Sequence, residues 1–125
     1  MSEGRRVLVT GGRDYSDSAK VITVLSEYHE LHGIAMLAHG ACEKHGNLRG
    51  ADGAAEAWAI VNSVPYVGWP ADWTRFGRSA GPRRNAELLA WFRPDVCIAF
   101  PGGTGTADCV RRCRAAGCEV VEVER

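Results

Sequence analysis

A glycine-rich turn between an apolar run and a helical segment gives this chain its clearest chemical signature. The turn follows the apolar run 96–100 and precedes residues 107–116, which are predicted to form a helix. Its residues are Pro101, Gly102, Gly103, Thr104, Gly105 and Thr106. Glycines let the backbone approach a phosphate, and the first amides of the helix point at it. The two threonine hydroxyls add donors at the same place. The turn therefore predicts a site for a phosphorylated small molecule.

A second glycine turn, Gly11-Gly12, follows the apolar run 7–10. These glycines serve either a tight turn with positive φ or a backbone cradle for a ligand. We favour the cradle, because the other glycine turn is expected opposite. Arg13 can clamp a phosphate with its planar guanidinium, and Asp14 can accept from a ribose hydroxyl or pair with a loop arginine.

Two further candidates follow the second apolar run, 34–39. Gly40 comes directly after this run, and Asp52 stands in the first turn of the helical segment 51–61. An acid there complements the positive end of its helix, or it accepts from ligand hydroxyls or a buried arginine. Both residues are predicted to contact the ligand.

The densest basic stretch, residues 78–85, opens the next helix. Positive charge is unfavourable at a helix N-terminus, and a bound anion gives a reason for it. Arg83 and Arg84 diverge by about 100° on a helix, so one of them points outward. We expect Arg83 to point inward, with Arg78 and Asn85 as further ligand contacts.

The chain has five cysteines: Cys42, Cys97, Cys109, Cys113 and Cys118. Cys97 falls in a predicted core strand, and Cys109 and Cys113 share one helix face. Because the chain has no C-x-x-C pair, we expect packing or incidental thiols and neither a metal site nor a cofactor.

These candidate residues are connected by alternating strand and helix patterns. Strands are predicted at 7–10, 34–39, 65–69, 96–100 and 120–123, and helices from a cap at 16–18 to Gly33, at 51–61, at 82–92 and at 107–116, with loops at 40–50 and 70–81. The alternation predicts an α/β, doubly wound, five-stranded and mainly parallel sheet with helices on both faces, in an order near 3-2-1-4-5. Both glycine turns then lie where the strand order reverses.

Composition narrows the class of protein. The 125 residues suffice for one domain, 1–125, and the 46% apolar residues for a packed core. The net charge of +0 argues against a nonspecific duplex-DNA binder. No apolar run is long enough to span a bilayer, and the first residues lack the shape of a signal peptide, so we expect a cytoplasmic protein.

Four motifs in this order resemble the SLOG superfamily, and most closely its YspA-like, YpsA-related branch. They are 11–15, 50–52, 77–85 and 101–108, and the resemblance covers nearly the whole chain. It implies a Rossmann-like fold that binds a nucleotide or a nucleotide-derived ligand such as AMP, ADP-ribose or an NAD-related molecule.

A more distant resemblance is to the LOG-type phosphoribohydrolases. It implies hydrolysis of an N-glycosidic bond, with an arginine that matches Arg83 or Arg84. The chain departs from that pattern, because Asp108 and then Cys109 stand where the relatives have a glutamate. A thiol cannot replace a carboxylate that stabilises a ribosyl cation, and Asp108 is rotated by about 100°. Arg83 and Asp108 are the predicted catalytic pair if hydrolysis occurs.

Three other functions stay open: a nucleotide sensor without turnover, a DNA-processing protein and a carrier of molybdenum cofactor. The neutral charge weighs against the DNA-processing protein. The expected partner is a nucleotide-derived small molecule, with neither a membrane nor nucleic acid. A homodimer is also expected, sealed by exposed Trp58, Trp91 and Phe92.

Overall fold

A computed structural model describes residues 4–44 and 47–124. Its main sheet has the order β5-β2-β1-β6-β7, and all neighbouring strands in it are parallel. The strands are β1 (Arg5–Thr10), β2 (Ile34–His39), β5 (Tyr66–Gly68), β6 (Val96–Ala99) and β7 (Glu119–Glu122). This is the predicted order 3-2-1-4-5 when the strands are counted along the chain, so the Rossmann-like α/β fold is confirmed.

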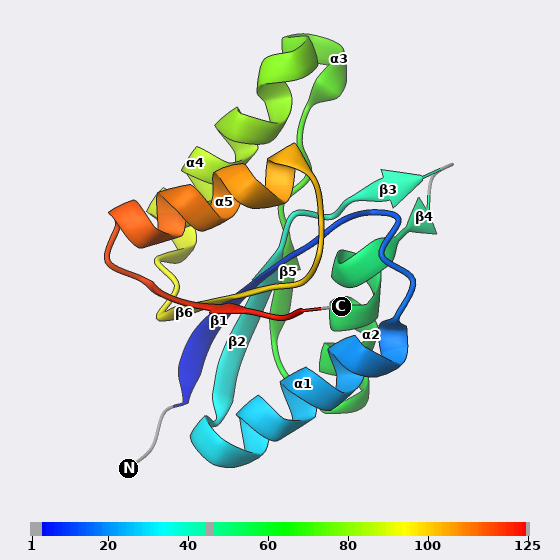
Figure 1. Ribbon diagram of the computed structural model, residues 1–125, viewed down its shortest axis with the longest axis vertical. Helices are drawn as coiled ribbons and strands as arrows, with labels where there is room; N and C mark the ends of the chain where they lie inside the picture. The colour runs from blue at the N-terminus through cyan, green and yellow to red at the C-terminus, as the bar shows by residue number, and fades with distance from the viewer. Residues whose placement is uncertain (1–3, 45–46, 125) are drawn as a thin grey trace.

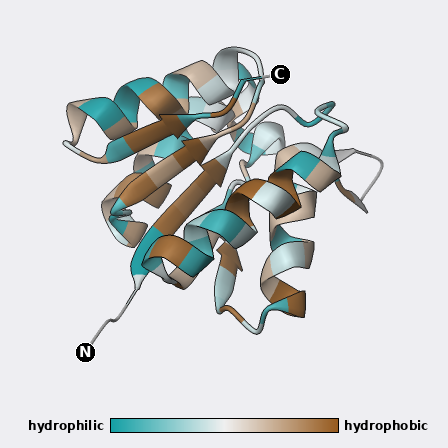
Figure 2. Cartoon of the chain, turned by 60° about the horizontal axis from the view of Figure 1, so that its bottom comes forward, coloured by the Kyte–Doolittle hydropathy of each residue, from teal (hydrophilic) through white to brown (hydrophobic). Residues whose placement is uncertain are grey.

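Helices cover both faces of the sheet (Figure 1). One face carries α1 (Ser18–His32) and α2 (Gly50–Val61), and the other carries α4 (Ala80–Phe92) and α5 (Thr104–Ala115). Strand residues alternate between the two faces, so Val7 and Val9 join the core under α1 and α2, while Leu8 joins the core under α4 and α5. The middle parts of the strands are accordingly hydrophobic, and the helices are mixed (Figure 2).

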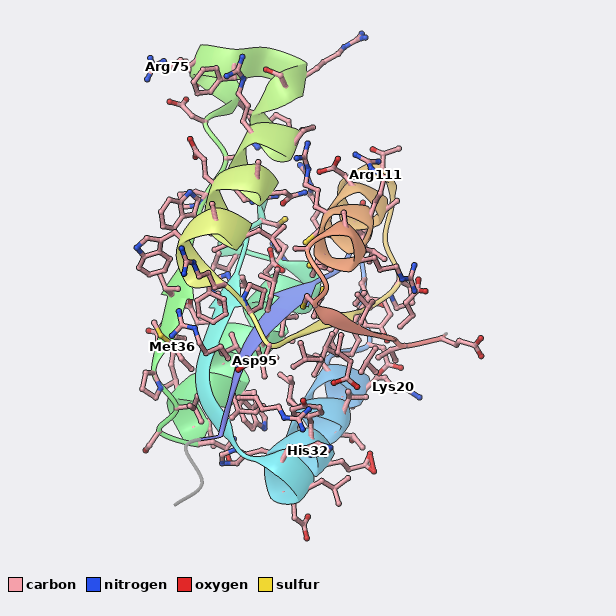
Figure 3. All side chains as sticks on the ribbon, turned by 90° about the vertical axis from the view of Figure 1, so that its left-hand side faces the viewer. Lys20, His32, Met36, Arg75, Asp95 and Arg111 are labelled. Atoms are coloured by element: carbon pink, nitrogen blue, oxygen red, sulfur yellow. The ribbon has the colours of Figure 1, made fainter. Side chains whose placement is uncertain are left out.

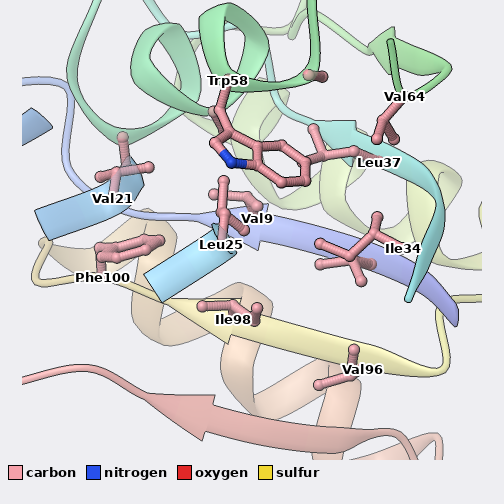
Figure 4. Packing of buried hydrophobic residues seen from close by; sticks show 14 residues of the cluster. Val9, Val21, Leu25, Ile34, Leu37, Trp58, Val64, Val96, Ile98 and Phe100 are labelled. Atoms are coloured by element: carbon pink, nitrogen blue, oxygen red, sulfur yellow. The ribbon is translucent and has the colours of Figure 1, made fainter. Parts of the chain in front are cut away.

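Large side chains fill the core under α1 and α2. Trp58 of α2 and Leu25 of α1 lie over Val9 of β1, with Ile98 of β6 beside them (Figure 4). All four are buried. This packing fixes α2 against the sheet and therefore positions the residues at its N-terminus.

The predicted boundaries of α1 are confirmed by its two ends. The carboxylate of Asp17 accepts a hydrogen bond from the backbone N–H of Lys20 at 3.1 Å, as a helix cap does. Gly33, at φ 77°, ends the helix.

Two predicted loops contain regular structure. The range 70–81 holds α3 (Trp73–Phe76) and the 3₁₀ helix η1 (Gly77–Ser79), and α4 already begins at Ala80. Pro82 is accommodated because first-turn amides have no acceptor within the helix. The range 40–50 holds β3 (Glu43–Lys44) and β4 (Asn47–Leu48), which pair antiparallel.

The expected exposed aromatic interface is wrong in two of its three residues. Trp58 and Phe92 are buried in the two cores, and Trp91 is half exposed. Their helical positions decide this, because Trp58 packs toward the sheet under α2 and Phe92 toward it under α4. In the described part of the chain, no helix combines the length and apolar character needed to cross a bilayer.

Candidate functional site

The two glycine turns are in direct contact. The backbone N–H of Gly12 donates a hydrogen bond to the carbonyl oxygen of Pro101 at 2.9 Å. A Cβ on Gly102 would lie 2.7 Å from that same nitrogen, so only glycine allows this approach. The predicted convergence of the turns after β1 and β6 is therefore present in the structure.

A cavity of about 840 Å³ is lined by residues of both turns. This volume is in the range of small-molecule sites. Its floor includes the N-terminus of α5, which begins at Thr104, three residues earlier than predicted. The amides of its first turn have no acceptor within the helix, and no acidic side chain stands there. An anion in this cavity would meet these amides and the positive end of the helix dipole.

Nearly all predicted site residues line this cavity. They are Gly11, Gly12, Arg13, Asp14, Gly40, Asp52, Arg78, Asn85, Pro101, Gly102, Gly103, Thr104, Gly105, Thr106 and Asp108. The exception is Arg83. Their roles toward a ligand stay predictions, but their assembly at one place is a property of the fold.

The expected inward orientation of Arg83 is wrong. Its side chain is exposed, its guanidinium lies 4.5 Å from the ring centre of Phe76, and its Nε donates to Ser79 Oγ at 3.0 Å. Arg84 lines the cavity in its place. The physical reason is the helix face, because Arg84 precedes the buried Leu88 by one turn. The four-residue spacing of Arg84, Leu88 and Phe92 is the sequence signal that identifies it.

A hydrogen-bond network holds Arg84 in place. Its Nε donates to Asn85 Oδ1 at 2.8 Å, and its Nη1 donates to the carbonyl oxygens of Gly40 and Trp69. A Cβ on Gly40 would force this guanidinium to move. The positive charge is thereby fixed beside the cavity with little freedom left to lose on ligand binding.

Asn85 connects α4 to α5. Its Nδ2 donates to the carbonyl oxygen of Gly105 at 3.2 Å and to Asp108 Oδ2 at 3.0 Å. Because its Oδ1 accepts from Arg84, the side chain links the glycine turn to the inward arginine. Asn85 is buried, so these bonds are made away from water.

Asp108 is held by ion pairs. Its Oδ1 pairs with Arg111 at 2.5 Å and its Oδ2 with Arg112 at 2.8 Å; Figure 3 shows Arg111 projecting from α5. Burial alone would raise the pKa of Asp108, but hydrogen bonds from Asn85 and Arg112 and the charges of both arginines outweigh it and lower that pKa. Asp108 therefore stays ionised and accepts a hydrogen bond from Asn85, and its catalytic role stays a prediction.

Asp52 lines the cavity and has one unsatisfied carboxylate oxygen. The residue is 2% exposed, and its Oδ2 accepts from the backbone N–H of Cys42 at 3.0 Å. Its Oδ1 is buried and has no hydrogen-bond partner among the described residues. Burial raises the pKa of Asp52 and raises that of the adjacent Cys42 thiol to about 12. A ligand group that shares a proton with Oδ1 would remove this deficit.

His39 stabilises the part of the site around Cys42 and Asp52. Its Nδ1 accepts from the backbone N–H of Ala41 at 2.9 Å, so the neutral ring carries its proton on Nε2, which donates to Glu56 Oε1 at 2.9 Å. The fully buried ring thus ties the loop before Cys42 to α2.

The raised pKa of Asp52 makes a pH-dependent prediction. Below its ordinary value of 3.8, Asp52 is protonated in both folded and unfolded chains. As the pH rises from there to the raised folded pKa, the unfolded chain loses its proton first, so wild-type stability falls. Asp52→Asn keeps an acceptor for Cys42 and lacks this loss. In thermal unfolding of both ligand-free proteins, the melting temperature of the variant should rise relative to that of the wild type as the pH increases from 3.8 to the raised pKa. A constant difference between the two melting temperatures over this pH range would contradict the assignment.

Several cavity residues were not among the predicted ligand contacts. Cys42, Tyr15, Trp73 and Arg111 all line it. Trp73 stands on α3 within a predicted loop, and its ring is half exposed. The α3 and η1 turns bring this ring to the cavity.

Comparison with known proteins supports one family assignment. A family model described as "YspA, cpYpsA-related SLOG family" matches residues 5–76, which include the Gly11-Gly12 turn and Asp52. The chain is similar to the Gene 61 protein of Mycobacterium phage D29, with 38% identity over an alignment of 125 positions that covers 94% of each chain. No solved structure matches the chain.

Proposed function

Because the chain belongs to the YspA, cpYpsA-related SLOG family, we propose that it binds a nucleotide or a nucleotide-derived phosphorylated ligand in the cavity between the glycine turns. One observation carries the proposal: two hydrogen-bonded glycine turns leave the first amides of α5 facing a cavity of suitable size. A phosphate is the common biological anion that uses such a site.

The cavity offers different chemistry at its different walls. The amides and hydroxyls of Thr104 and Thr106 would bind a phosphate, and Arg84 supplies positive charge from α4. The free oxygen of Asp52 would accept from a sugar hydroxyl. The half-exposed ring of Trp73 offers a stacking surface to a base. Phosphate, sugar and base together are the parts of a nucleotide.

Thermal unfolding with AMP, ADP-ribose and NAD tests the proposal, with adenosine as the control that lacks phosphate. A ligand at 100 times its dissociation constant stabilises the folded chain by about 2.7 kcal/mol. We expect stabilisation by at least one phosphorylated compound and a smaller effect of adenosine. If no phosphorylated compound stabilises the chain, or if adenosine acts equally, the proposal is wrong.

Hydrolysis of the N-glycosidic bond is a second candidate, favoured by the buried carboxyl of Asp52. A carboxyl with a raised pKa can keep its proton and donate it to a leaving base. Water would add to the C1′ carbon as the C–N bond breaks, and the proton released by that water would restore Asp52. Free base released from nucleoside monophosphates, and its loss in Asp52→Asn, would support this step. Ligand binding without release would leave a binding module.

Adjacent arginines on α4 provide a matched pair of variants. Arg84→Ala should weaken AMP roughly tenfold or more and adenosine much less, because a charge-assisted hydrogen bond contributes roughly 1.5–3 kcal/mol. Arg83→Ala removes the same charge from the outward face and should leave both affinities unchanged. Titration calorimetry measures both. Equal losses of AMP and adenosine in Arg84→Ala would argue against a phosphate contact.

A further inference from the structure

Three cysteine thiols gather under α4 and α5. Cys97 of β6 and Cys109 and Cys113 of α5 are buried, and their Sγ atoms all lie within 4.8 Å of one another. The side chains around them, which include Leu8, Leu88 and Phe92, are ordinary apolar residues. Packing explains why these positions are apolar, but it gives no reason for three sulfurs at one point.

The spacing of the sulfurs suits a metal ion. Zinc–sulfur bonds are about 2.3 Å long, so the sulfurs around one zinc ion lie about 4 Å apart. Cys109 and Cys113 are one helical turn apart and present their thiols from the same face of α5. Cys97 approaches from the strand beneath, so the three sulfurs surround a common point from two elements.

A fourth thiol adjoins the trio. Cys118 follows α5, is half-buried, and packs against the same apolar cluster as the trio. Its Sγ also donates to the carbonyl oxygen of Glu119 at 3.3 Å. The partial exposure of Cys118 gives a metal ion an entrance from solvent.

We propose that Cys97, Cys109 and Cys113 bind a thiophilic divalent cation of the zinc class, with Cys118 as the fourth ligand. As each sulfur–metal bond forms, that thiol releases its proton to solvent, so metal binding releases protons. The ion would fasten α5 to β6 directly behind the glycine turn. This assignment replaces the expectation of packing thiols and is independent of the nucleotide proposal.

Cobalt titration of the whole chain, purified in reductant and stripped of metal, tests the site. We expect a thiolate-to-cobalt charge-transfer band that saturates at one cobalt per chain and disappears when zinc is added. Cys113→Ala should lose the saturable band. Cys42→Ala is the matched control and should keep it, because Cys42 lies outside the trio.

If Cys113→Ala does not fold, two further measurements test the metal site. Zinc should raise the melting temperature of the wild type, and Cys118→Ser should weaken zinc binding at least roughly tenfold, as loss of a ligand requires. A folded wild type without a saturable cobalt band overturns the proposal. So does a folded Cys113→Ala whose band matches that of the wild type.

Discussion

Gly103→Val should abolish stabilisation by a phosphorylated ligand while the chain stays folded. A Cβ on Gly103 meets no atom within 4 Å, and the residue lines the cavity at the N-terminus of α5. A valine side chain there would occupy the space that a phosphate needs to reach the first helical amides. We therefore expect loss of the whole ligand shift in thermal unfolding, about 2.7 kcal/mol at 100 times the dissociation constant.

The matched control is Ala107→Val. It adds a β-branched side chain to an exposed position one turn further along α5 and outside this cavity. The melting temperatures without ligand should be similar for the two variants, and only Gly103→Val should lose the ligand shift. A normal shift in folded Gly103→Val would remove the glycine turn 101–106 from the site.

The fold followed from the sequence because its signals are local and repeated. Apolar runs, glycine turns and the cap at Asp17 each mark one boundary, and alternating strands and helices permit few topologies. Both glycine turns come directly after strands, so parallel pairing brings them to the same edge of the sheet. The convergence of the site was therefore predictable before any contact was known.

Orientation within the helices was harder to predict. Choosing between Arg83 and Arg84 requires the phase of α4, which the predicted start at Pro82 does not give and the spacing of Leu88 and Phe92 does. The structure sets the phase through Leu88 and Phe92, which are buried against the sheet. The pairing of Asp108 with Arg111 and Arg112 was likewise hidden, because a carboxylate three and four residues before arginines also suits an exposed helix face.

The convergence of the three thiols could not be read from their spacing. Cys109 and Cys113 share a helix face, which the sequence indicates, but Cys97 joins them only because α5 packs back over β6. No short motif records this long-range contact. The same holds for the free oxygen of Asp52, whose burial depends on how α2 meets the turn after β1.

The meeting of α2 with the turn after β1 depends on Gly50, and Gly50→Ala should cost about 3 kcal/mol of unfolding free energy. The residue has φ 64°, and an added Cβ would overlap the carbonyl oxygen of Gly12 and lie 2.7 Å from the Cα of Arg13. The left-handed backbone costs an L-residue about 1–2 kcal/mol, and the collision with backbone adds about 1–3 kcal/mol. Denaturant unfolding at neutral pH measures the loss.

Gly117→Ala separates the two contributions. Gly117 has φ 81°, but an added Cβ there meets no atom within 4 Å, so only the backbone cost of about 1 kcal/mol applies. Equal losses in the two variants would show that α2 can withdraw from the turn without cost. If it does withdraw, Asp52 leaves its buried position, and the pH-dependent loss of stability assigned to that carboxyl should shrink in Gly50→Ala. The unfolding free energy lost in Gly50→Ala and the titration of Asp52 therefore both report on the packing of α2 against the turn after β1.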